Sequence, residues 1–269
     1  MIGSGNLLKM EAEIKTVVQY YLPLGDQRIE LNHMLGQTIR LKFTGQINCI
    51  ATGEKISKSY NGGYSFKSSN SLPECDICIV RPELCHIEDG TCRDANWGKA
   101  NCQIPHIIYL SLTSSPKIGI TREKNIPKRW IDQGATEGLP ILRVKDRLTS
   151  GLIEVEIAKT MKDKTNWRKM LIGECDEEVD LYVLRDQIYE DFGDLIDKFD
   201  AEDLDEEIQK ISYPVIDLPE KIVSLNFDKT PLIEGILLGV KGQYLILNTG
   251  VINIRKHQGY FIEMTKLNQ

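Results

Sequence analysis

The sequence predicts an α+β protein made of three successive parts. Short apolar runs separated by glycine-rich turns, a pattern typical of β-strands, lie near both ends of the chain. Between them are a cysteine-rich stretch and then two strand-like runs followed by a short helical segment. We therefore expect an N-terminal β and Cys-rich module over residues 1–104, a small central mixed sheet with helices over 105–173, and acidic helices with a small β cap over 174–269.

The composition indicates a folded protein of the cytoplasm. Of its 269 residues, 41% are hydrophobic and 27% are charged, which is ordinary for globular domains. No apolar run approaches the roughly 18 residues of a membrane helix, and residues 1–9 lack the sustained apolar region of a secretion signal, so we expect no membrane association. Because the net charge is −6, any binding of nucleic acid needs a local basic face.

The first predicted elements are strands near the N-terminus. Alternating apolar residues predict strands at 39–43 and 47–49. Residues 52–74 are rich in Gly, Ser, Lys and Asn, which favours a loop or a small hairpin like that of a zinc module.

Five of the seven cysteines follow within a short polar stretch. They are Cys75, Cys78, Cys85, Cys92 and Cys102. In a reducing cytoplasm, clustered cysteines hold metal more often than they form disulfides, and an odd count argues against a closed disulfide set. Cys75 and Cys78 have the spacing of a metal knuckle, so we expect a structural zinc ion on this pair and on two or three of the later cysteines. Buried cysteines without metal are the alternative.

The central part reads as strands joined by turns, followed by helices. The predicted elements are strands at 106–112, 117–121 and 141–147 and a helix at 127–133. Thr113 to Pro116 suits a hairpin turn. Pro127 suits the first turn of the helix and Gly134 its C-terminal cap. Residues 151–163 fit both a strand and a helix, and periodicity alone does not decide between them.

The last part begins with an abrupt change of charge. Residues 174–213 hold 16 Asp and Glu against 3 Lys and Arg, with apolar residues at helical spacing, which predicts one or two acidic helices. After Pro214, glycines separate further strand-like runs. These runs are 222–224, 233–240, 244–247, 251–254 and 260–262.

Several longer motifs resemble the bacterial domain-of-unknown-function 2797 family. They include "CDICIVRPELCHIEDGTCRDANWG", "PHIIYLSLTSSPKIGITR", "DKTNWRKML" and "GVKGQYLILNTGVINIRKHQGYF". The resemblance runs from about residue 35 to 265 and names no reaction. Members of the family carry cysteines where this chain has Thr52, Ser65 and Ser68, which implies a first zinc ribbon that retains Cys49 alone and no longer holds metal.

The central part separately resembles the GIY-YIG nuclease superfamily over residues 105–163. The run "IIY" ending at Tyr109 stands at the first signature without its glycine, and "KIG" beginning at Lys117 stands at the second with Lys in place of Tyr. "KRW" matches the helix that presents the catalytic arginine, here Arg129, and Glu154 matches the metal-binding glutamate. The resemblance implies a GIY-YIG-like domain in which the ambiguous segment is a helix.

These residue types suit the hydrolysis of a phosphodiester, which needs an activated water and stabilisation of charge on the phosphoryl oxygens. Glu154 is the candidate ligand of a catalytic Mg²⁺ or Mn²⁺ ion, because hard cations prefer oxygen ligands. Arg129 is suited to grip the phosphate and Tyr109 to relay a proton, with Lys117 as a nearby cation. Each residue also has a plain structural explanation, as a core tyrosine or an exposed charged side chain.

Three functions stay open from the sequence: a metal-dependent nuclease acting on DNA or RNA, a zinc-stabilised nucleic-acid-binding protein that does not cut, and a protein-interaction scaffold docking through the β cap. Residues 103–173 favour the first two, because they hold 13 Lys and Arg against 7 Asp and Glu, and phosphate affinity comes from such cations. The polar run 163–168, which includes Trp167, suits either a nucleotide contact or the packing of a helix turn.

Overall fold

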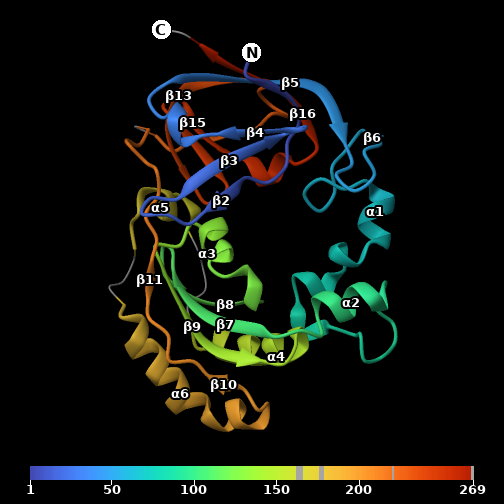
Figure 1. The fold of residues 1–269 in the computed structure, drawn as a ribbon, viewed down its shortest axis with the longest axis vertical. Helices are drawn as coiled ribbons and strands as arrows, with labels where there is room; N and C mark the ends of the chain where they lie inside the picture. Colours follow the sequence, from blue (N-terminus) through green and yellow to red (C-terminus); the bar gives the residue numbers. More distant parts are fainter. Residues whose placement is uncertain (162–165, 176–178, 220, 268–269) are drawn as a thin grey trace. The chain divides into compact units, whose positions relative to one another are not determined.

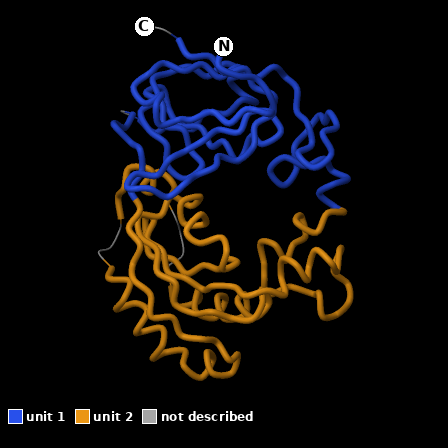
Figure 2. The backbone as a smooth tube through the Cα atoms, viewed as in Figure 1, with its two compact units in different colours: residues 1–70, 212–269 blue, residues 71–211 orange. Residues whose placement is uncertain are grey.

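The chain divides into two compact units (Figure 2). The computed structural model describes residues 1–161, 166–175, 179–219 and 221–267. Unit 1 combines residues 1–70 with 212–269, and unit 2 is the continuous segment 71–211. The finer division at 104/105 and 173/174 stays a prediction.

Unit 1 is built around one large sheet that takes strands from both ends of the sequence (Figure 1). Its order is β1-β16-β5-β13-β14-β15-β12, and β6 pairs with β5. The bounds are β1 Gly3–Asn6, β5 Thr38–Asn48, β6 Lys55–Ile56, β12 Ser224–Leu225, β13 Leu232–Lys241, β14 Tyr244–Leu247, β15 Gly250–Asn253 and β16 Tyr260–Leu267. β5 is antiparallel to both β13 and β16, so the strands predicted near the two ends of the chain belong to the same sheet.

A second sheet and several short helices complete unit 1. The sheet has the order β2-β3-β4, with β2 Glu11–Glu13, β3 Gln19–Leu24 and β4 Gln27–Glu30; the 3-10 helices are η1 Asn32–Met34 and η6 Ile254–His257. Helix α1, Phe66–Ser71, lies in the segment for which we expected a loop or hairpin. The sequence did not predict this helix because serine and asparagine favour turns and caps over helix interiors.

Unit 2 contains a five-stranded sheet that follows the predicted central strands. It has the order β10-β9-β7-β8, and β11 also pairs with β9. The bounds are β7 His106–Leu112, β8 Pro116–Arg122, β9 Glu137–Val144, β10 Glu202–Asp203 and β11 Gln209–Lys210. The strand pairs of this sheet are antiparallel, whereas we expected a mixed sheet. The tight connection between β7 and β8 reverses the chain, and this gives an antiparallel pair.

Helices cover both faces of this sheet (Figure 1). Their bounds are α2 Ala95–Asn101, α3 Lys128–Gln133, α4 Arg147–Ala158, α5 Trp167–Ile172 and α6 Leu181–Lys198, with the 3-10 helices η2 Pro73–Cys75, η3 Ile77–Ile79, η4 Pro82–Leu84 and η5 Glu123–Asn125. α4 and α6 share a buried core with one face of the sheet, to which Ile108, Ile118, Ile153 and Ile188 contribute. α3 lies on the opposite face.

The helix boundaries follow from residues that were visible in the sequence. Gly134, with φ 74°, ends α3 as predicted. Asp146 accepts a hydrogen bond from the backbone N–H of Thr149 at 2.8 Å and so caps the N-terminus of α4. The ambiguous segment is therefore a helix as far as Ala158, and residues 162–165 lie outside the described part of the chain.

Among the helices of the described residues, none has the length and the apolar character that it would need to cross a membrane.

Candidate functional site

Tyr109 lies on the face of the unit 2 sheet that α3 covers. Its ring meets the ring of Trp130 edge to face, with 5.8 Å between the centroids. Both side chains are 1% exposed. Gly138 of β9 leaves room for this packing, because a Cβ atom there would lie 2.4 Å from the Trp130 ring. The tyrosine is therefore part of the core, as the plain structural explanation held.

The phenol nevertheless extends across the edge strand of its sheet. β8 is the last strand in the order β10-β9-β7-β8, and Gly119 on β8 is the cross-strand partner of Tyr109. A Cβ atom at Gly119 would lie 2.8 Å from the phenol oxygen, which is closer than Cβ contacts come. The glycine thus leaves space for the phenol above β8.

Two side chains of α3 act on this phenol. Arg129 and Gln133 are one helical turn apart and so share a face of the helix. The Tyr109 hydroxyl donates to Oε1 of Gln133 at 3.1 Å. Among the described residues, Nε of Arg129 and Nε1 of Trp130 are buried without a hydrogen-bond partner. Buried N–H groups usually have a hydrogen-bond partner, so each of these two can still donate to one acceptor.

Glu154 lies on α4 and contributes to the electrostatics of the same phenol. The neighbouring Ile153 and Ile157 point into the core on the opposite face of the sheet, while α4 packs along β8 and β7. The half-buried carboxylate of Glu154 is near enough to act electrostatically on Tyr109.

Lys117 holds a different position from the other three predicted residues. It lies two residues before Gly119 on β8, hence on the same face of the strand, and pairs in register with Ser111. It is not among the charges that act most strongly on the phenol. The structure therefore places Arg129 and Gln133 of α3 beside the phenol of Tyr109. Lys117 lies on the neighbouring strand β8, and Glu154 lies on α4, which packs against the other face of the sheet.

The surroundings of Tyr109 favour its protonated form. Burial raises the pKa of the phenol, and this effect is larger than the opposing charge and hydrogen bonding of Arg129 and the hydrogen bond with Gln133. The negative charge of Glu154 raises the pKa further. The phenol therefore holds its proton at neutral pH unless an additional cation approaches it.

A second group of predicted residues lines a small cavity elsewhere in unit 2. The cavity has a volume of about 10 Å³, which is room for about one water-sized sphere, and its lining includes Cys78, Cys85, Cys92 and Cys102. Cys75 is not among the lining residues. These cysteines form no disulfide. Burial raises the pKa of Cys78 to about 12 and that of Cys102 to about 11, in each case with a contribution from neighbouring thiols.

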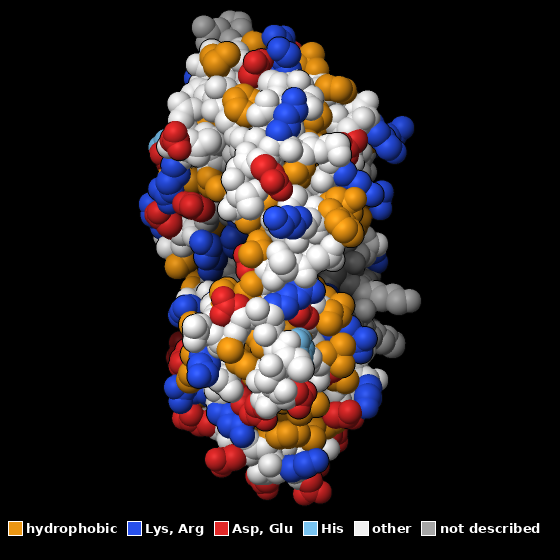
Figure 3. Space-filling model, turned by 90° about the vertical axis from the view of Figure 1, so that its right-hand side faces the viewer, with side chains coloured by type: hydrophobic (Ala, Val, Ile, Leu, Met, Phe, Trp, Pro, Cys, Tyr) orange, Lys and Arg blue, Asp and Glu red, His pale blue; other side chains and the backbone are white. Residues whose placement is uncertain are grey.

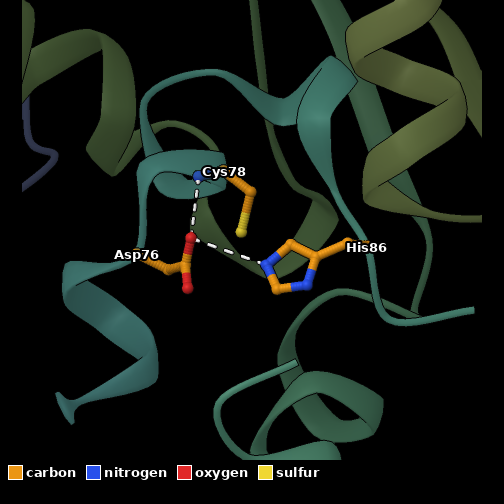
Figure 4. Close-up of side chains that lie close together, drawn as sticks. All are labelled: Asp76, Cys78 and His86. Atoms are coloured by element: carbon orange, nitrogen blue, oxygen red, sulfur yellow. Dashed lines mark hydrogen bonds and ion pairs between the residues drawn. The ribbon is translucent and has the colours of Figure 1, made fainter. Parts of the chain in front are cut away.

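Asp76 and His86 also face this cavity and were not expected there as a pair (Figure 4). Ligand atoms of Asp76, Cys78 and His86 lie within 4.8 Å of one another, which is close enough for a shared metal ion. However, the Asp76 carboxylate already pairs with Nε of Arg93 at 2.7 Å. Nδ1 of His86 lies 2.8 Å from the Thr91 hydroxyl, and Nε2 lies 3.6 Å from Asp76.

A third polar cluster surrounds Cys49 in unit 1. Ser68 lies 3.5 Å from the Cys49 sulfur and 3.0 Å from the Ser65 hydroxyl. Burial alone would raise the pKa of Cys49, but its hydrogen bonding with Ser68 and Thr52 lowers it to about 6. The positions that the sequence analysis compared with a lost zinc ribbon therefore lie together, joined by hydrogen bonds.

Sequence reasoning did not find the residue that joins the cysteine region to α4. The Arg147 backbone N–H donates to the carbonyl of Cys102 at 2.8 Å. Its guanidinium donates to the carbonyls of Cys78 and Ile79 at 3.2 Å and 2.6 Å. No local pattern marks an arginine whose partners lie nearly 70 positions earlier in the chain. The sequence indicated the role of Gln133 only weakly, through its spacing of one helical turn from Arg129.

These features define an α+β protein with a buried tyrosine that contacts α3 next to the edge strand of one sheet and with a separate cysteine-lined cavity. The chain belongs to the family described as "Protein of unknown function (DUF2797)", whose model matches residues 36–262. This confirms the family predicted from the longer motifs. Comparison with curated proteins and with solved structures gave no match.

Proposed function

We propose that this protein is a metal-dependent nuclease of the GIY-YIG type that hydrolyses phosphodiesters in DNA or RNA. The observation that carries this proposal is the position of the Tyr109 phenol, which bonds Gln133 of α3 at 3.1 Å, one helical turn from Arg129. The charges of Arg129 and of Glu154, which come from different helices, both influence this phenol. A tyrosine, a guanidinium and a carboxylate around one point supply a proton relay, a phosphate anchor and a metal ligand.

In this proposal Arg129 grips the scissile phosphate. Its Nε is buried without a partner among the described residues, and a phosphate oxygen is an acceptor that would satisfy it. A guanidinium binds phosphate through parallel N–H contacts, which also fix its orientation. Gln133 orients the phenol because its amide oxygen accepts a hydrogen bond from the Tyr109 hydroxyl.

Glu154 is the residue that would hold the catalytic Mg²⁺ or Mn²⁺ ion. Mg²⁺ is commonly bound through one or two carboxylates together with substrate phosphates, so a single half-buried glutamate fits this ion. When bound, the ion would stabilise negative charge on the phosphoryl oxygens and lower the pKa of a bound water. Because its pKa is raised, Tyr109 would need such a cation nearby to lose its own proton before it could take one from water.

Binding of nucleic acid without cleavage is the second candidate. It is favoured by the 1% exposure of Tyr109, since a relay residue has to reach its substrate. On the face shown in Figure 3, Lys and Arg side chains are interspersed with Asp and Glu instead of forming one broad patch. Affinity for phosphate would then come from a few local cations such as Arg129 and Lys117.

Cleavage assays with matched variants test the first proposal. Purified protein is incubated with plasmid, single-stranded DNA and RNA, with and without Mg²⁺ or Mn²⁺. Arg129→Ala and Glu154→Ala should each lower the cleavage rate at least about 100-fold, the scale of removing a transition-state contact. Lys128→Ala and Glu156→Ala are the controls, because these exposed neighbours on the same helices should leave the rate unchanged.

The outcomes separate the candidate functions. Metal-dependent cutting that both site variants lose, and both controls keep, supports the nuclease. Salt-dependent binding without cutting selects the second candidate. If the protein neither cuts nor binds nucleic acid, the third alternative from the sequence, the protein-interaction scaffold, is left.

A further inference from the structure

We infer that unit 2 binds a zinc ion through the thiolates of Cys78, Cys85, Cys92 and Cys102. All four side chains line the same small cavity. Among these four described residues, no three sulfur atoms lie within 4.8 Å of one another, so the ion would draw them together on binding. Zinc prefers four ligands in a tetrahedron, and four thiolates form a closed structural site with no position for a substrate. This site is separate from the proposed cleavage centre and does not depend on the nuclease activity.

The segment around the cavity has little core to hold it together. Between Pro73 and Leu84 it consists of three 3-10 turns, and Ile77, Val80 and Leu84 are 54%, 75% and 41% exposed. Segments that bury so few apolar groups usually need a disulfide or a metal. Since the cysteines are not paired in disulfides, a metal ion is the cross-link that their position fits.

The other groups at the cavity are better suited to support the ligands than to bind the ion. Asp76 forms its closest ion pair with Arg93 and also accepts from the Cys78 backbone N–H. His86 uses both ring nitrogens, one toward Thr91 and one toward Asp76. Outer groups of this kind orient the ligands of a metal site. For this reason we do not assign the close Asp76, Cys78 and His86 trio as the ligand set.

Helix α2 connects two of the proposed ligands. Cys92 lies just before its first turn, and Cys102 forms its C-terminal cap. Gly98, in the middle of the helix, lets the Cys92 sulfur approach, because a Cβ atom there would lie 3.2 Å from that sulfur. Asp94 starts the helix by accepting from the Trp97 backbone N–H at 2.9 Å. A metal ion held by Cys92 and Cys102 would fix both ends of α2.

The same site supports the start of α4. Arg147, the first residue of α4, binds carbonyl groups of Cys78, Ile79 and Cys102. Gly151, one turn later, lies against the backbone of η4, where a Cβ atom would come within 2.5 Å of a backbone nitrogen. The zinc ion would therefore stabilise the first turn of α4, the helix that also carries Glu154.

Elemental analysis of the purified full-length chain tests the ligand set. We expect about one zinc ion per chain, retained by Cys75→Ser and Cys175→Ser and lost, at least tenfold, by Cys85→Ser and Cys92→Ser. Cys85 and Cys92 are partly exposed, so their replacement perturbs packing less than replacement of the buried Cys78 or Cys102. Far-ultraviolet circular dichroism checks that each variant is folded.

Two further measurements keep the inference open to refutation. Replacing zinc by Co²⁺ should produce strong sulfur-to-metal charge-transfer absorption, because thiolates are the ligands. Removing the metal with a chelator should speed amide hydrogen exchange at the start of α4. A wild-type chain that contains no zinc and binds no Co²⁺ overturns the inference. The inference is also overturned if His86→Ala loses the metal while Cys85→Ser and Cys92→Ser both retain it.

Discussion

At the scale of single residues, Gly119 and Tyr109 depend on each other through space. Replacing Gly119 with alanine places a methyl group 2.8 Å from the phenol oxygen, so the ring must move. Overpacking of this kind costs about 1–3 kcal/mol, and we expect Gly119→Ala to lower the free energy of unfolding by that amount in urea titrations. Gly193→Ala is the control, because a Cβ atom on Gly193 meets no neighbour within 4 Å. Equal stability of Gly119→Ala and the wild type would contradict the close approach.

The thiol of Cys49 should make stability depend on pH. Its pKa of about 6 in the folded protein is below the ordinary value near 9. The unfolded chain then binds more protons between these values, so the stabilisation is complete above about pH 9 and is lost as the pH falls toward 6. We expect the stability difference between the wild type and Cys49→Ser to grow by more than about 1 kcal/mol from pH 6 to pH 9. Urea titrations at several pH values measure it, and a constant difference argues against the shift.

At the scale of elements, the cap of α4 connects stability to the proposed activity. Asp146→Ala removes the acceptor of the Thr149 N–H and should cost about 0.5–2 kcal/mol. Because α4 carries Glu154, we also expect slower cleavage. Asp180→Ala is the matched control, since Asp180 caps α6 through the Tyr182 N–H at the same 2.8 Å distance and α6 carries no proposed site residue. An equal loss of activity in both variants would contradict a specific role of α4.

The elements show how far the sequence alone leads. The strands at 106–112 and 117–121 and the helix that ends at Gly134 were predictable, because turn residues and caps act locally. The grouping of Tyr109, Arg129 and Glu154 in one site stays a prediction that rests on the resemblance to a known superfamily. The contacts of Arg147 and the pairing of β5 were not, since they join residues far apart in the sequence and no local preference encodes them.

At the scale of the whole molecule, the two units differ in how much of the chain each requires. Unit 2 is one continuous segment with its own core. We therefore expect a fragment of residues 71–211 to keep its helices and to unfold cooperatively in urea. A fragment of residues 212–269 should stay unfolded, because β13 and β16 lose their shared partner β5. A disordered 71–211 fragment would show that unit 2 depends on the rest of the chain.

The central position of β5 between β13 and β16 also bears on how the protein is made. A ribosome releases β5 before unit 2, but both neighbouring strands leave the exit tunnel only after unit 2. All of unit 2 has emerged by then, so it can complete its core while β5 still waits with unpaired edges. During that interval β5 is exposed to wrong pairing with other chains, and slow completion of the C-terminal strands would favour aggregation.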